Sequence, residues 1–119
     1  MLLHLNISSE EDFGMPIFLQ ISRHSPENCP AFNEKAKEAS MNALGKMDEL
    51  MKKHGVKMLG YWVAPREHTG YMVVEAPNFG ALQKLSMEPE MDAMRAFNTT
   101  EVKPVIKLEE TLVMQEYMK

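Results

Sequence analysis

The chain has 119 residues, a formal net charge of −4 and a single cysteine, which suits one domain whose core needs no disulfide. The acidic balance leaves no surplus of cations for a nucleic-acid backbone, and no apolar run approaches the roughly 20 residues that cross a bilayer. The apolar start lacks a basic segment and passes into the polar stretch 8–12, so we expect no signal peptide and a cytoplasmic location.

Residues 1–14 are predicted to form a tail or extension, and residues 15–119 to form a single domain. The first strand is predicted at residues 16–24, because apolar and mixed side chains alternate there. One side carries Ile17, Leu19 and Ile21, and the other carries Phe18, Gln20, Ser22 and His24.

A long helix is predicted to begin within residues 25–30 and to end at Gly55. Ser25 can cap its start with Pro26 in the first turn, and a start near Pro30 is the alternative. Glycine supplies the left-handed backbone that commonly ends a helix. Inner positions recur at steps of three and four, at Phe32, Ala36, Ala39, Ala43, Met47 and Leu50.

Two further strands are predicted at residues 56–64 and 69–76, and their short polar connection suits an antiparallel hairpin. Pro77 and Asn78 begin a second helix, which Pro89 bends. Residues 101–107 contain Pro104, which cannot donate a ladder hydrogen bond, so an edge strand is predicted there. Residues 108–118 are predicted to close the chain as a helix.

The resulting order is β-α-β-β-α-β with an extra C-terminal helix, the α+β pattern of a ferredoxin-like fold with a four-stranded antiparallel sheet. Helices cover one face of such a sheet and leave the opposite face, called here the open face, without cover. We therefore expect a second copy of the chain to cover the open face.

Side-chain alternation predicts which residues the open face carries. If Ile17 and its neighbours on that side pack under the helices, Phe18, Gln20, Ser22 and His24 lie on the open face. Glu75 should not lie unpaired beneath helices, so Tyr71, Val73 and Glu75 are assigned there too. Alternation does not decide which side of the strand at residues 56–64 faces the helices. We assign Trp62 to the open face. Such a mixture suits a small-molecule pocket, and it also suits a dimer interface with a polar rim.

Three stretches of the chain resemble small uncharacterised proteins of the dimeric α/β-barrel superfamily. They read SRHSPENC at residues 22–29, GYW at 60–62 and HTGYMVVEAP at 68–77. The superfamily includes antibiotic-biosynthesis monooxygenases and muconolactone isomerase. The resemblance covers about residues 15–107 and consists of strand and turn patterns rather than a catalytic signature. It implies two ferredoxin-like subunits that pack their sheets face to face around a cavity.

Two residues are the catalytic candidates. His24 lies at a predicted strand end, where an imidazole can act as a general base, and Glu75 is a second possible base. Glu75 has a structural alternative, an ion pair with Lys103 or Arg23. The candidate ligand-binding residues are Phe18, Trp62, Tyr71 and His68.

Metal and cofactor sites have weaker signals. Cys29 and Glu75 can join the two histidines as metal ligands, but the chain has no closely spaced pair such as H-x-H or C-x-x-C, so we assign no metal site. Cys29 on its own suits a buried, unreactive thiol. The chain has no glycine-rich phosphate loop, and no cofactor is expected.

These observations predict a cytoplasmic homodimer that binds a small, partly apolar molecule. The resemblance implies a cofactor-independent monooxygenase or isomerase as the enzyme class. Two alternatives stay open, a non-catalytic ligand-binding or metal-binding module and a structural dimerisation domain.

Overall fold

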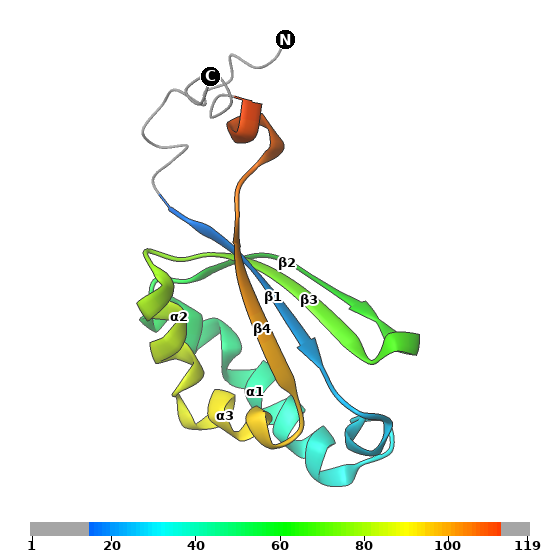
Figure 1. The fold of residues 1–119 in the computed structure, drawn as a ribbon. Helices are drawn as coiled ribbons and strands as arrows, with labels where there is room; N and C mark the ends of the chain where they lie inside the picture. The colour runs from blue at the N-terminus through cyan, green and yellow to red at the C-terminus, as the bar shows by residue number, and fades with distance from the viewer. Residues whose placement is uncertain (1–14, 113–119) are drawn as a thin grey trace.

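The computed structural model describes residues 15–112, which form one antiparallel sheet with helices on one side (Figure 1). The strands are β1 (Ile17–Arg23), β2 (Lys57–Ala64), β3 (Thr69–Glu75) and β4 (Thr99–Val105), in the order β2-β3-β1-β4. The helices are α1 (Glu34–Lys53), α2 (Phe79–Ser86) and α3 (Pro89–Asp92), and 3-10 turns lie at η4 (Pro26–Asn28), η5 (Pro65–Glu67) and η6 (Ala93–Ala96). This is the predicted ferredoxin-like fold.

The predicted edge strand and the break at Pro89 are confirmed, although the strand begins at Thr99 and not at residue 101. β4 lies at the edge of the sheet and accommodates Pro104, as the missing donor requires. α3 begins at Pro89, so the proline starts a new helix and separates it from α2. The predicted tail at residues 1–14 and residues 113–118 of the predicted closing helix lie outside the described residues, whereas 108–112 are helical. Between residues 15 and 112, no helix is both long and apolar enough to span a membrane.

α1 starts later than predicted. Its N-cap is Asn33, whose side chain accepts a hydrogen bond of 2.9 Å from the backbone N–H of Ala36. Ser25 makes no side-chain cap, because Pro26 opens the short turn η4 instead of the long helix. Phe32, predicted to face inward, therefore precedes the helix and is 83% exposed. The end of α1 is as predicted, with Gly55 in the left-handed region at φ 71°.

The core fills the space between the sheet and the helices. Val74 of β3 is its largest fully buried side chain. Phe18 of β1 belongs to the same cluster, and its ring centroid lies 6.2 Å from that of Phe79. Helices α1 and α2 contribute apolar side chains from the other side. The buried cluster comprises Phe18, Leu50, Met51, Val56, Met72, Val74, Ala76, Leu82 and Leu85.

The predicted assignment of β1 to its two faces is wrong. Directly opposite residues of an antiparallel pair lie on the same face, and Phe18 stands opposite Val74 and Gln20 opposite Met72. Since Val74 and Met72 belong to the core, Phe18 and Gln20 face the helices. Ser22 and His24, which were assigned to the same side, follow by alternation. The open face instead carries Leu19 and its neighbours at positions 17 and 21.

The assignments of Tyr71, Val73, Glu75 and Trp62 to the open face are confirmed. A β-bulge at Leu59 decides the last of them. Met58 stands opposite Val74 and faces the core, whereas Trp62 stands opposite Tyr71 on the other face. Strict alternation would have put Met58 and Trp62 on one face. The ring of Trp62 lies over Gly60, where an added Cβ would come within 2.2 Å of it.

Glu88 joins the end of α1 to the connection between α2 and α3. Its carboxylate lies 2.8 Å from the ammonium nitrogen of Lys53 and 2.6 Å from Nε2 of His54. These two hydrogen bonds, with that of Lys53 first, lower the pKa of Glu88 below its ordinary value of 4.5. The ionised carboxylate is therefore the form that the fold favours.

We expect Glu88→Gln to lower the melting temperature at neutral pH, because it removes this ionised partner. A carboxyl group with a lowered pKa stabilises the fold above its ordinary pKa, and that contribution is lost as the pH falls through the lowered value. The difference in melting temperature between wild type and variant should therefore shrink as the pH falls below 4.5. Thermal unfolding followed by circular dichroism measures both effects.

Glu49→Gln is the matched control, because Glu49 is an exposed residue of α1 that lies 3.9 Å from Lys46. It should leave the melting temperature nearly unchanged at every pH. A difference between wild type and Glu88→Gln that stays constant down to acid pH would contradict the role of the ionised carboxylate.

Candidate functional site

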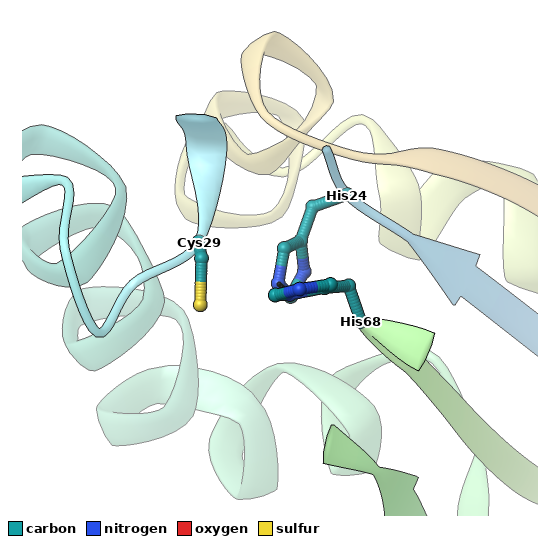
Figure 2. A group of neighbouring side chains, drawn as sticks. All are labelled: His24, Cys29 and His68. Atoms are coloured by element: carbon teal, nitrogen blue, oxygen red, sulfur yellow. Dashed lines mark hydrogen bonds between the residues drawn. The ribbon is translucent and has the colours of Figure 1, made fainter. Parts of the chain in front are cut away.

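His24 and His68 meet at one end of the sheet. The pairing of β1 with β3 ends at Arg23 and Thr69. His24, which follows β1, and His68, which precedes β3, therefore lie opposite each other. The backbone N–H of His24 donates to the carbonyl of His68 at 3.1 Å and extends the ladder. Nε2 of His24 lies 3.3 Å from Nδ1 of His68, and the rings meet edge to face (Figure 2). The strand register therefore brings together two imidazoles that are 44 residues apart.

The turn before β3 fixes the backbone of His68. η5 ends there with the N–H of His68 donating to the carbonyl of Pro65 at 3.2 Å. His68 has φ 52° and ψ 42°, in the left-handed region that residues other than glycine seldom adopt. Among non-glycine residues the described chain has a positive φ at this position alone. A strained backbone of this kind is typical of a residue whose placement serves a site.

Cys29 brings a thiol to the two rings. It closes η4 by donating its N–H to the carbonyl of Pro26 at 3.2 Å, and its own carbonyl accepts from Asn33, the N-cap of α1. The Sγ atom and one nitrogen of each histidine all lie within 4.8 Å of one another. Figure 2 shows the sulfur beside the paired rings. We call His24, Cys29 and His68 the His–Cys–His cluster; all three residues are partly buried.

The surroundings of His24 control its charge. Burial lowers the pKa of His24 below its ordinary value of 6.5, the nearby charge of His68 lowers it further, and a hydrogen bond with the Asn98 side chain raises it. The net direction is downward, so the imidazole is neutral at physiological pH. A neutral imidazole can accept a proton or bind a metal ion.

A hollow of about 410 Å³ lies beside the cluster. Its lining comes from the end of β1, the loop that contains η4, and the segment from η6 to the start of β4. We call it the His24 hollow, and most of the residues that line it have polar side chains. The lining residues are Arg23, His24, Ser25, Asn28, Arg95, Ala96, Phe97, Asn98 and Thr99.

Both arginines of the lining already have carboxylate partners. Arg23 lies 3.4 Å from Glu101, and Arg95 lies 3.0 Å from Asp92. These pairs are largely exposed, so each guanidinium can exchange its partner at little cost. The His24 hollow therefore offers positive charge and hydrogen-bond donors to a small molecule.

The structure does not assemble the predicted pocket. Trp62 and Tyr71 form a neighbouring pair on the open face, whereas Phe18 lies in the core on the other side of the sheet. Glu75 is at the far end of β3 from Thr69, the residue next to His68, about 20 Å away at a rise of ~3.3 Å per residue. Of the predicted site residues, the structure therefore brings together His24 with His68 and, separately, Trp62 with Tyr71.

The alternative prediction, an ion pair of Glu75 with Lys103 or Arg23, is also wrong. Arg23 and Lys103 both pair with Glu101, at 3.4 Å and 3.3 Å. Glu101 stands opposite Ile21 in the ladder, and Lys103 stands opposite Leu19. The pair with Lys103 therefore forms along β4, and the pair with Arg23 forms between β4 and β1.

Sequence reasoning missed Arg95 and Asn98 as neighbours of His24. They follow the short helix α3, and their approach to β1 depends on the path of the chain through η6 into β4. No local pattern carries that information. The one available signal was the edge position of the last strand, which places its start beside the end of β1.

Comparison with known proteins identifies the family. The profile of DUF3303, a domain of unknown function, matches residues 29–118. The chain belongs to this family. The matched part of this DUF3303 domain includes Cys29 and His68, whereas His24 precedes it.

Solved structures with similar folds share little sequence with the chain. One is a conserved protein of unknown function from Bacteroides thetaiotaomicron, described as a possible oxidoreductase, with 12% identity, a TM-score of 0.42, and coverage of 77% of this chain and 96% of that one. Another is a protein from Pseudomonas aeruginosa with 13% identity, a TM-score of 0.45, and coverage of 79% and 95%. No curated protein matches the chain. The family assignment therefore comes from DUF3303 alone.

Proposed function

We propose that this DUF3303 protein is a small-molecule-binding homodimer of the dimeric α/β-barrel superfamily, with its ligand in the His24 hollow. The hollow is the single observation that carries the binding proposal. Its volume of about 410 Å³ is within the range of small-molecule sites, and its lining combines an imidazole, amides and hydroxyls.

The lining favours a more polar ligand than the sequence indicated. Arg23 and Arg95 supply positive charge, and Asn28, Asn98 and Thr99 supply hydrogen bonds. Phe97 contributes an aromatic side chain to the same lining. A small carboxylic acid with an apolar part fits these groups best.

The resemblance to monooxygenases and isomerases extends the proposal to cofactor-independent proton transfer with His24 as the base. A base must lie within hydrogen-bond reach of the proton that it removes, and His24 lines the hollow in which the substrate would lie. Glu75 has no part in this step, because it lies about 20 Å from that end of the sheet.

The open face supports the homodimer. Helices cover one side of the sheet, and the other side carries the aromatic pair Trp62 and Tyr71 beside Leu19 and Val73. Trp62 is 60% exposed, which is unusual for so large an apolar side chain on a sheet. A second copy that packs its own open face there would bury these side chains.

Benzoate, a small aromatic carboxylate, is the probe for the hollow. Saturation-transfer NMR on the full chain, with a chelator present, should show binding, and Arg95→Gln should weaken it about five- to tenfold, a modest loss because the arginine is exposed. Arg66→Gln, which removes an exposed arginine outside the lining, should leave binding unchanged. Failure of the folded wild type to bind benzoate, or equal losses in the two variants, would contradict the proposal.

A further inference from the structure

We propose that the His–Cys–His cluster is a binding site for a zinc-type divalent metal ion, with Nε2 of His24, Nδ1 of His68 and Sγ of Cys29 as its ligands. Imidazole nitrogen and thiolate sulfur are the ligands that zinc prefers. Here they come from three separate segments, the end of β1, the loop that contains η4 and the residue before β3. This inference goes beyond ligand binding in the His24 hollow and does not depend on it.

The distances between the ligand atoms fit one ion. Two nitrogens that each lie about 2.0–2.1 Å from a tetrahedral zinc ion are about 3.3 Å apart, and a sulfur at about 2.3 Å from zinc lies about 3.5 Å from each nitrogen. The nitrogens of His24 and His68 are 3.3 Å apart. One nitrogen of each ring lies within 4.8 Å of the sulfur of Cys29, so the sulfur needs to approach by at most about 1.3 Å. Side-chain rotation of a partly buried cysteine covers that distance.

The neighbours of the cluster are compatible with a bound metal ion. No carboxylate of the described residues joins the cluster, so no acidic side chain competes for its ligand atoms. Asn98 hydrogen-bonds His24. In a metal site, such a hydrogen bond orients the imidazole ligand.

Three protein ligands leave one coordination position open. Within residues 15–112, no fourth histidine, cysteine, aspartate or glutamate belongs to the cluster. Zinc sites with three protein ligands and one exchangeable position are the kind that bind a substrate or water, whereas structural sites are filled by four protein ligands. His24 also lines the hollow, so a bound ion lies next to the space proposed for the ligand.

The two proposals assign different roles to Nε2 of His24, a free base in one and a metal ligand in the other. They are tested separately. The benzoate experiment uses a chelator and so reports on the hollow alone, whereas the metal titration uses no benzoate. Either can fail while the other succeeds.

The experiment titrates the full chain, stripped with a chelator, with Zn²⁺ by calorimetry and with Co²⁺ by absorption spectroscopy. We expect one ion per chain, a thiolate-to-cobalt charge-transfer band, and a higher melting temperature with zinc. Cys29→Ser should abolish the band. It should also weaken zinc binding by more than roughly 100-fold, because loss of a residue that merely hydrogen-bonds a ligand already costs roughly 10–100-fold. His24→Asn and His68→Asn should weaken zinc binding likewise.

His54→Gln is the matched control, because His54 pairs with Glu88 away from the cluster. It should bind zinc as the wild type does. If a histidine variant fails to fold, Cys29→Ser decides the question, since the contact between the two rings does not involve the thiol. No stoichiometric zinc binding by the folded wild type, or equal binding by wild type and Cys29→Ser, would overturn the proposal.

Discussion

Phe18→Ala is expected to lower the free energy of unfolding by about 3–5 kcal/mol, the usual cost of removing a buried phenylalanine. Phe18 is 6% exposed, stands opposite the fully buried Val74 and packs near Phe79. A domain of this size has a total stability of roughly 5–15 kcal/mol, so the variant loses a large part of it. Urea unfolding followed by circular dichroism measures the change.

Phe32→Ala is the matched control, because the same side chain is removed from a site that is 83% exposed. We expect a change within about 0.5 kcal/mol. If Phe18 lay on the open face, as the sequence indicated, its replacement would instead affect association more than stability. A loss of stability that is the same at both positions would contradict the position of Phe18 in the core.

Trp62→Glu is expected to weaken the proposed dimer by at least about 30-fold, which corresponds to the ~2 kcal/mol of an aromatic hot spot. The substitution removes the largest exposed side chain of the open face and places a charge in the interface. Analytical ultracentrifugation over a range of concentrations measures the dissociation constant. Trp62 is the sole tryptophan of the chain, so its fluorescence reports burial on association.

Leu44→Glu is the control for Trp62→Glu. Leu44 lies on α1, on the helix side of the sheet and not on the open face, and is also 60% exposed. The same charge introduced there should leave the dissociation constant unchanged. A wild-type chain that sediments as a monomer at every concentration would refute the dimer, and equal weakening by both substitutions would place the interface elsewhere.

Local signals in the sequence predict the order of the elements, but they do not predict which residues lie on each face of the sheet. The faces of β3 were assigned correctly from Glu75, because a carboxylate is costly to bury. In β1 the side of Ile17, Leu19 and Ile21 is the more apolar, so composition alone favoured packing the wrong side under the helices. The register decides it, since Glu75 stands opposite Ile17, and the carboxylate argument then places Ile17 on the open face. Register between strands distant in sequence has no local signal.

The start of α1 was missed because two local signals competed. Ser25 and Pro26 have the residue types of a helix start, but they form the 3-10 turn η4, and Asn33 caps the helix. A short turn satisfies the same cap preference as a long helix, so residue types alone do not distinguish them.

The His–Cys–His cluster could be anticipated only as a set of residues. Each imidazole was expected at a strand end, and Cys29 beside a helix start, but their spacing in the chain matches no metal motif. The pairing of β1 with β3 brings the two histidines into contact, and η4 brings the thiol. Such sites depend on tertiary structure, and spacing rules do not detect them.

The extra residue at Leu59 has a consequence for comparing members of the family. Before the bulge Met58 pairs with Val74, and after it Gly60 pairs with Val73, the residue of β3 adjacent to Val74. Removal of Leu59 would therefore leave a regular ladder in which every later side chain still points the same way. Homologues can differ in length by one residue at this position and present identical surfaces. An alignment that places such a gap anywhere else in the strand would interchange inward-facing and outward-facing positions.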